Sequence, residues 1–371
     1  MAIRSGAARS GRSGPKERLG RLRLSLSELR ADAVLVSHLP NIRYLCGFSG
    51  SAGLLLVDSA SATLFTDSRY TFQAREEVTA ARIQTCKQGL LRAVGEALQG
   101  RKGRTRVAYS ASVLTVAQKQ SLEAAAGSRV HWVPDGGAVE KLRAVKDAEE
   151  VSILGAAAQL ITEVFGRVAE ELRPGLTELA LAAEIEHEIK RRGGSGPSFD
   201  TIVASGPRSA WAHARPTAKP LGRNELVVFD QGAILRGYCS DMTRTVFLGR
   251  ASAKVRSLYQ AVLDAQQAGK QAIRPGITAG EVDKAARDSL KRARLDRYFT
   301  HSLGHGLGLE VHEMPRLGRG EETVLQEGMV LTVEPGVYLE GIGGIRIEDD
   351  VVVTAQGARD LTSAPRALLE I

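Results

Sequence analysis

The sequence has 371 residues, 43% of them hydrophobic, so it can bury a large core, and its length suggests two domains. Its net charge is +8, but the first 23 residues hold seven Lys or Arg and one Glu, which leaves the rest near +2 and argues against a nucleic-acid partner. Three widely spaced cysteines form no disulfide framework, and no apolar run approaches the roughly 20 residues that cross a bilayer. These features predict a cytoplasmic protein without a membrane partner.

The first part of the chain combines a tail with an α/β pattern. Residues 1–16 are rich in Gly, Ser, Ala and Arg without periodicity, which predicts a disordered basic tail rather than the organelle transit peptide that it faintly resembles. Residues 17–140 alternate helical and strand patterns, beginning with a helix, a strand at Ala33–Ser37 and a turn at Pro40–Asn41. This segment is predicted to be a small α/β domain.

Residues 141–371 are predicted to form a second domain that contains an internal repeat. Its first long helix begins at Asp147, an N-cap residue with Glu150 three positions later. Two Arg-Pro-Gly units begin at Arg173 and Arg274, and each is followed by a threonine that caps the next helix (Thr177 and Thr278). A duplicated helix–helix–hairpin unit would bring its two hairpins together about a pseudo-twofold axis.

The two hairpins are expected at Val227–Arg244 and Val330–Asp350, and each carries two carboxylates. With midpoints at Leu235/Arg236 and at Gly341, Asp230 would lie opposite Asp241, and Glu334 opposite Glu348. Cross-strand neighbours have Cβ atoms about 4.5–5.5 Å apart. Carboxylates crowded in this way share a proton or hold a metal ion.

A histidine-rich segment lies between the second helix pair and the second hairpin. It contains His301, His305 and His312, and glycines flank His305 on both sides. His305 is therefore the expected nitrogen ligand beside the four carboxylates. Four oxygen donors and one imidazole favour two divalent ions of the harder kind, Mn²⁺ first, with Co²⁺, Zn²⁺ and Fe²⁺ as alternatives.

These residues resemble the pita-bread metallopeptidases, the group that contains aminopeptidase P, prolidase, methionine aminopeptidase and creatinase. The spacings match: eleven residues between the aspartates, twenty-nine from His305 to Glu334, and fourteen between the glutamates. The resemblance covers Ala144 to the C-terminus, and the preceding domain is similar to that of the creatinase and prolidase branch. It implies an α+β fold with a C-terminal pita-bread domain. It also implies that Asp241 and Glu348 bridge two metals, with Asp230 on one and His305 and Glu334 on the other.

The family resemblance also implies the activity, hydrolysis of the bond between an N-terminal residue and proline by a metal-activated water, with a proline-containing peptide as substrate and a homodimer as the assembly. Glu334 would transfer the proton, and further catalytic or substrate contacts would come from His213, His312, His301 and Arg316. Arg346 would hold Glu348 in place. The sequence departs from the family pattern at Ala212, because the Xaa-Pro enzymes usually have a proline immediately before the histidine that corresponds to His213.

Three functions follow from this resemblance. An Xaa-Pro aminopeptidase is preferred, because no arginine except Arg316 is available to capture the free carboxylate of a dipeptide. An Xaa-Pro dipeptidase (prolidase) is the close alternative. A non-enzymatic peptide-binding module is the third, although such modules have typically lost the metal ligands that are all present here.

Overall fold

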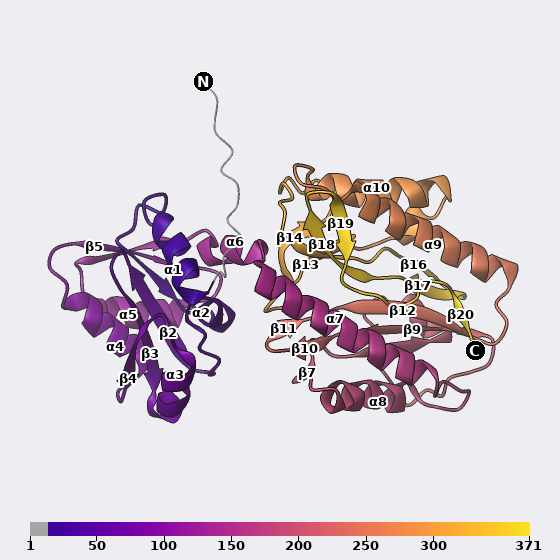
Figure 1. Cartoon of the computed structure of the whole chain (residues 1–371), viewed down its shortest axis with the longest axis horizontal. Helices are drawn as coiled ribbons and strands as arrows, with labels where there is room; N and C mark the ends of the chain where they lie inside the picture. The colour runs from indigo at the N-terminus through magenta and orange to yellow at the C-terminus, as the bar shows by residue number, and fades with distance from the viewer. Residues whose placement is uncertain (1–13) are drawn as a thin grey trace, which may run out of the picture. The chain divides into compact units, whose positions relative to one another are not determined.

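The computed structural model describes residues 14–371 and contains two compact units, one ending at Arg143 and the other spanning Ala144–Ile371 (Figure 1). The boundary inferred from the sequence lies between residues 140 and 141. Most of the predicted tail falls on residues 1–13, which lie outside the described residues. Its last two residues, however, belong to helix α1 (Pro15–Leu24), so the first helix begins two residues earlier than expected. Proline suits this position because the first turn of a helix needs no N–H from it.

The first unit contains one mixed sheet of six strands in the order β4-β3-β2-β1-β5-β6. Strand β1 pairs antiparallel with β2 and parallel with β5, as expected where helices connect some of the strands. The strands are β1 (Ala33–Val36), β2 (Gly53–Asp58), β3 (Ala62–Asp67), β4 (Arg82–Cys86), β5 (Thr105–Tyr109) and β6 (Val130–Pro134). The further helices are α2 (Leu39–Cys46), α3 (Thr71–Glu77), α4 (Leu90–Gln99), α5 (Val116–Ala126) and α6 (Ala138–Ala144).

The turn predicted at Pro40–Asn41 is wrong, because both residues lie in helix α2. Pro40 occupies the first turn, where a missing N–H costs nothing. The helix buries Ile42 and Leu45 and ends at Gly47, whose φ of 88° is left-handed.

The second unit holds four helices and four sheets. The helices are α7 (Ala148–Ala169), α8 (Glu178–Arg191), α9 (Ala253–Ala272) and α10 (Ala279–Arg292). A four-stranded sheet has the order β20-β12-β9-β8, and a five-stranded sheet has the order β14-β13-β15-β18-β19. Their strands are β8 (Ile202–Ser205), β9 (Glu225–Gln231), β12 (Met242–Leu248), β20 (Leu369–Glu370), β13 (Gly304–Gly306), β14 (Glu313–Leu317), β15 (Val330–Val333), β18 (Asp349–Thr354) and β19 (Gly357–Asp360).

Two small sheets extend the hairpins. One has the order β11-β10-β7 and the other pairs β16 with β17. Their strands are β7 (Gly196–Pro197), β10 (Ala233–Leu235), β11 (Tyr238–Cys239), β16 (Gly336–Leu339) and β17 (Gly343–Arg346).

The internal repeat appears in the backbone contacts of the two Arg-Pro-Gly units. Gly175 N–H donates to Leu221 O, and Gly276 N–H donates to Leu325 O, each at 2.9 Å. Both glycines are left-handed, with φ of 92° and 89°. Both predicted threonines cap their helices: Thr177 accepts from the N–H of Ala180, and Thr278 from that of Glu281. The two repeats therefore share the same individual hydrogen bonds at these positions.

Each half of the second unit has its own hydrophobic core. Helices α7 and α8 pack with β9 and β12 in one core, and α9 and α10 pack with β15 and β18 in the other. Figure 1 shows the two helix pairs on opposite sides of the sheets. Helix α7 is long and apolar enough to cross a membrane, but half of its apolar window is buried inside the fold, as in a core helix.

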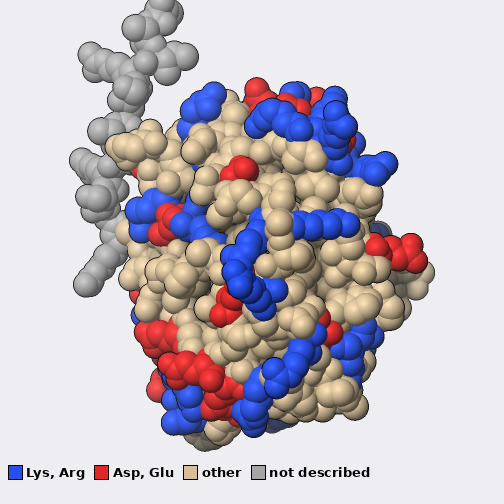
Figure 2. Space-filling view, turned by 90° about the vertical axis from the view of Figure 1, so that its right-hand side faces the viewer, with Lys and Arg blue, Asp and Glu red and all other residues tan. Residues whose placement is uncertain are grey.

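One face of this unit carries charged side chains of both signs between uncharged ones (Figure 2). Figure 2 shows Lys and Arg interspersed with Asp and Glu over the face that it presents. Opposite charges close together largely cancel each other's field at a distance.

Candidate metal centre

The first hairpin carries Asp230 on β9, and Asp241 immediately precedes β12. Asp230 lies opposite Thr243, not opposite Asp241 as predicted. The cause is the turn, whose two left-handed residues are Arg236 (φ 50°) and Gly237 (φ 84°), one residue later than the predicted midpoint. The shift moves the partner by two residues, so Asp241 still faces the same side of the hairpin as Thr243.

The second hairpin has the predicted register. Strand β15 pairs Thr332 with Asp350, and the tip strands pair Gly336 with Arg346. Both pairings place Glu334 opposite Glu348 and centre the turn on Gly341, which has a φ of 76°. The main chain therefore brings these two glutamates to facing positions, as predicted. Burial and then the charge of Glu334 raise the pKa of Glu348.

Carboxylates of both hairpins meet at His305. A ligand atom from each of Asp241, His305 and Glu348 lies within 4.8 Å of the others. His305 Nε2 is 3.4 Å from Glu334 Oε1 and 3.7 Å from Asp241 Oδ2. The Oδ1 atoms of Asp230 and Asp241 are buried and accept no hydrogen bond within residues 14–371. Unsatisfied buried carboxylate oxygens beside an imidazole suit a divalent cation, so these residues fit a metal.

The orientation of His305 suits metal binding. Its Nδ1 lies 3.0 Å from the carbonyl of Gly306, an atom that can only accept, so Nδ1 carries the proton. This leaves the Nε2 lone pair directed at the carboxylates. Gly306 also allows a close approach of chains, since a Cβ there would lie 2.1 Å from Met314 O.

Arg346 links both hairpins, but its carboxylate partner is not the predicted one. Its Nη2 donates to Asp230, and it reaches Glu348 only through Thr243. The Nε of Arg346 donates to Thr243 Oγ1 at 3.0 Å, and that hydroxyl donates to Glu348 Oε2 at 2.6 Å. The side chain of Arg346 is 3% exposed, so a buried chain of direct contacts holds two of the carboxylates.

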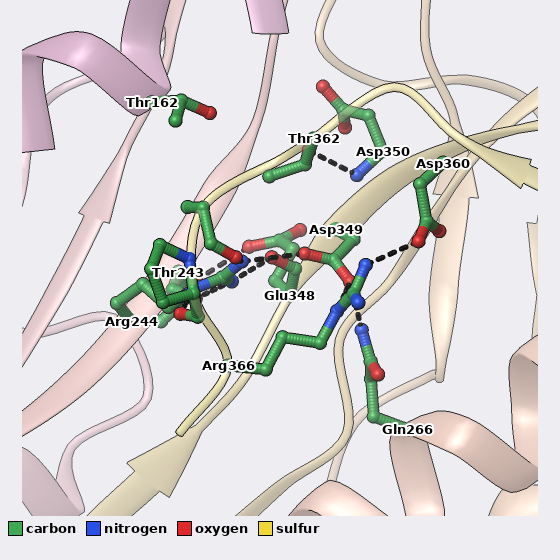
Figure 3. Close-up of polar contacts among 12 residues, drawn as sticks. Thr162, Thr243, Arg244, Gln266, Glu348, Asp349, Asp350, Asp360, Thr362 and Arg366 are labelled. Carbon is green, nitrogen blue, oxygen red and sulfur yellow. Dashed lines mark hydrogen bonds and ion pairs between the residues drawn. The ribbon is translucent and has the colours of Figure 1, made fainter. Parts of the chain in front are cut away.

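A network of buried ion pairs around Asp349 holds the main chain at Glu348 (Figure 3). Arg244 donates to the carbonyl of Glu348 at 2.6 Å and to the carboxylate of Asp349 at 2.7 Å. Asp349 also pairs with Lys270 and Arg366. The main chain at Glu348 is therefore anchored independently of its own side chain.

The remaining predicted site residues lie around this cluster. His312 is exposed, with its ring centroid 4.4 Å from that of His305. The Nδ1 of His301 lies 2.8 Å from the carbonyl of Ser302 and so carries the proton, which leaves Nε2 to accept from the hydroxyl of Tyr338 at 2.9 Å. Arg346 donates to the same hydroxyl at 2.7 Å. The loop of His213 reaches the cluster through its neighbour Ala212, whose carbonyl accepts from Arg346 at 3.1 Å.

Arg316 lies on β14 directly opposite His305 on β13. Its Nε donates to Ser302 Oγ at 2.6 Å, and the residue is exposed. The guanidinium thus lies beside the strand that carries the imidazole ligand.

Two parts of the chain match known families. Residues 18–145 match the creatinase/prolidase N-terminal domain, and residues 152–355 match metallopeptidase family M24. The chain belongs to metallopeptidase family M24. The predicted α+β fold, with its creatinase-type first domain and pita-bread second domain, is confirmed.

This M24 enzyme is similar to several Xaa-Pro peptidases. It is 37% identical to an Xaa-Pro dipeptidase of Pyrococcus furiosus, over 95% of this chain and 100% of the relative. It superimposes on the Xaa-Pro dipeptidase from Bacillus anthracis with a TM-score of 0.92 at 36% identity, over 96% and 100% of the two chains. It also superimposes on an X-Pro aminopeptidase from Thermotoga maritima, with a TM-score of 0.86 at 34% identity, over 94% of this chain and 100% of the other.

Sequence reasoning missed two residues of the M24 site. Thr243 joins Arg346 to Glu348, and its position two residues after Asp241 on a strand was an available signal, because alternate residues share a face. Tyr338 joins Arg346 to His301, and nothing in the sequence marked it.

Burial dominates the electrostatics of the metal-free M24 site. It raises the pKa of Glu334 to about 8, with the charge of Asp230 adding to the rise. Burial and then the neighbouring carboxylates raise the pKa of Asp241 and of Glu348 well above the ordinary range. Burial lowers the pKa of both His301 and His305 to about 4, so both imidazoles are neutral at pH 7.

We expect the metal-free protein to lose stability as the pH rises from about 6.5 to 8, the range above the ordinary pKa of His301 and His305, whose lowered pKa values act in the opposite direction at lower pH. A carboxyl whose pKa is raised on folding binds its proton more tightly in the folded state, so its contribution is largest at low pH and disappears above the folded pKa. Each such group contributes up to about 1.4 kcal/mol per pH unit. Calorimetry with a chelator should show this decline, and Mn²⁺ should abolish it. Identical pH profiles with and without metal would contradict this assignment.

Proposed function

We propose that the protein is an Xaa-Pro dipeptidase. The observation that carries this proposal is the position of Arg316, an exposed residue that pairs with His305 in the β13–β14 ladder and whose guanidinium donates to Ser302 Oγ. A dipeptide has a free carboxylate on its proline, and an arginine beside the reaction centre would bind it in a charge-assisted pair. The dipeptidases among the relatives support this choice over the aminopeptidase that the sequence alone favoured.

Two divalent ions, Mn²⁺ in our proposal, would be held by Asp230, Asp241, His305, Glu334 and Glu348. When bound, such ions lower the pKa of a water and polarise a carbonyl group. The carboxylate of Glu334 accepts a hydrogen bond from Thr332 Oγ1 at 3.3 Å, which fixes its direction. Glu334 is therefore our candidate to accept the proton of the attacking water and pass it to the proline nitrogen.

The histidines take separate roles in this proposal. His312 is exposed beside His305 and would donate to the oxyanion that develops on the scissile carbonyl. His213 would contact the bound peptide. His301 accepts from Tyr338 and is neutral at pH 7, so it would serve to hold that tyrosine and through it Arg346.

A substrate comparison tests the proposal. We expect Xaa-Pro dipeptides to be cleaved with a higher kcat/KM than Xaa-Pro-Yaa tripeptides. Replacing Arg316 with alanine should lower kcat/KM for Xaa-Pro by about 10- to 100-fold, the value of one hydrogen bond to a charged group. The same variant should change the cleavage of Xaa-Pro-amide by less than about threefold, because the amide has no carboxylate.

The matched control is Arg319→Ala, which removes another exposed arginine three residues further along the chain. It should leave both substrates unaffected. Tripeptides cleaved at least as well as dipeptides, together with no substrate-dependent effect of Arg316→Ala, would support the aminopeptidase instead. Similarity to the X-Pro aminopeptidase from Thermotoga maritima makes that the second candidate.

The assembly and location belong to the same proposal. We propose a homodimer that acts in the cytoplasm. Sedimentation of the purified protein should give twice the mass of the 39.7 kDa chain.

A further inference from the structure

A buried carboxylate outside the metal centre accepts hydrogen bonds from both ends of the loop that carries His213, and we call this set of contacts the clasp. Glu178 is the first residue of α8, and its side chain is 0% exposed. In the second repeat the equivalent place, one residue after the capping threonine, is occupied by Ala279. A buried charge is costly unless it is well bonded, so Glu178 stands out as a difference between two otherwise matching halves.

Glu178 binds both ends of this loop, residues 205–217. At one end, its Oε1 accepts from the N–H and the hydroxyl of Ser205, both at 2.9 Å. At the other end, its Oε2 accepts from the N–H of Thr217 at 3.1 Å and from the hydroxyl at 2.8 Å. Although burial opposes the charge, the hydrogen bonds from Thr217 and Ser205 keep the pKa of Glu178 below its ordinary value.

Arg208 extends the clasp into the loop. Its Nε donates to Glu178 at 3.2 Å, and its Nη2 donates to the carbonyl of Arg215 at 2.6 Å. The guanidinium also lies 4.8 Å from the ring centroid of Trp211, two residues before His213. The two ends of the loop and Arg208 are thus tied to one carboxylate.

The middle of the loop is anchored to the metal centre instead. Ser209 Oγ accepts from Gly344 N–H on β17 at 2.9 Å, and Arg346 donates to Ala212 O. A Cβ at Gly344 would lie 2.0 Å from Ser209 O, so the contact allows no side chain. Glu178 fixes the two ends while Arg346 fixes the centre, and His213 is held between the two anchors.

We infer that Glu178 is a positioning residue that sets the place of His213 over the bound peptide. The inference rests on the proposed function, because it assumes that His213 contacts the substrate. Displacing a contact group by about 1 Å can cost up to roughly 10²-fold in rate. Loss of the clasp should therefore lower kcat more than it raises KM, and should leave the metal in place.

The test is Glu178→Gln against Glu188→Gln. The glutamine amide has one acceptor oxygen in place of two, so the donors at one end of the loop, Ser205 or Thr217, lose their partner. Glu188 is the matched control: it is a 1% exposed glutamate on the same helix, and it pairs with Arg191 and Arg192, away from the loop of His213. Both variants should lose some stability and retain wild-type metal content. Only Glu178→Gln should lower kcat for Xaa-Pro, by about 10- to 100-fold.

Two further readouts separate positioning from general damage. In a His213→Ala background, Glu178→Gln should cause no further loss of kcat, because its effect passes through His213. In a Trp132→Phe background, Trp211 is the remaining tryptophan, and its fluorescence should become more accessible to acrylamide in Glu178→Gln than in Glu188→Gln.

The results can overturn the inference in three ways. Wild-type kcat in Glu178→Gln, fully additive losses with His213→Ala, or unchanged quenching of Trp211 would each refute it. If Glu178→Gln fails to fold, Thr217→Val removes one donor at lower cost and should shift kcat and quenching in the same direction. If the wild-type protein cleaves no Xaa-Pro substrate, the proposed function fails, while Trp211 quenching still tests whether Glu178 holds the loop.

Discussion

Replacing Asp241 with asparagine should empty the metal centre and remove essentially all activity. Asp241 contributes a carboxylate to the group that includes His305 and Glu348, and one of its oxygens has no other partner within the described chain. An amide keeps the shape but loses the charge that binds a divalent cation. We expect elemental analysis to find little metal in Asp241→Asn and kinetic assays to find no Xaa-Pro hydrolysis.

The same substitution should affect stability in opposite ways with and without metal. In the metal-free protein, asparagine relieves repulsion among buried carboxylates, so the melting temperature should stay the same or rise. In the presence of Mn²⁺, the variant should lack the stabilisation that binding gives the wild type. His312→Ala is the contrast: it should keep its metal and lose turnover by roughly 10²–10³-fold. Normal metal content in Asp241→Asn would remove Asp241 from the ligand set.

Replacing Arg244 with methionine should destabilise the fold by about 3–5 kcal/mol, the usual cost of breaking a buried ion pair from one side. Arg244 is 2% exposed, and all three of its guanidinium nitrogens donate. Its acceptors are Thr243 O, Glu348 O, Asp349 Oδ1, Ala364 O and Pro365 O. Lysine should not rescue the variant, because one ammonium cannot replace a planar fork of donors.

Urea unfolding measures this effect in the presence of chelator, so that metal loss does not contribute. The control is Arg366→Met, since Arg366 binds the same carboxylate of Asp349 but is 30% exposed. The free energy of unfolding should fall less than half as much in Arg366→Met as in Arg244→Met. With metal added, Arg244→Met should also bind Mn²⁺ more weakly, because the carbonyl of Glu348 is no longer held (Figure 3). Equal unfolding midpoints for wild type and Arg244→Met would disprove the assigned role.

The parts of the fold that could be predicted follow from short-range rules. The N-caps at Asp147, Thr177 and Thr278 and the register of the second hairpin depend on residues within a few positions of each other. The register of the first hairpin failed by one residue at the turn, because two adjacent left-handed residues could be placed in more than one way. Period-two patterning still kept Asp230 and Asp241 on one face.

The supporting contacts of the site could not be predicted in the same way. Arg346 is two residues from Glu348 in sequence, but its carboxylate partner, Asp230, is 116 residues away in the chain. Glu178 is the first residue of a helix, where an acidic side chain is ordinary, so its role on the loop of His213 had no local signal. Contacts of this kind depend on how separate elements meet in three dimensions.

The duplicated architecture limits how the two repeats can diverge in evolution. Several contacts near the metal centre join one repeat to the other: Asp241 N–H donates to Asp350, Thr243 to Glu348, and Arg244 to Asp349. A substitution on either side of such a pair would need a compensating change in the opposite repeat. Helices that make no contact of this kind with the opposite repeat face no such requirement. One repeat can therefore hold a glutamate at position 178 while the other holds an alanine at 279.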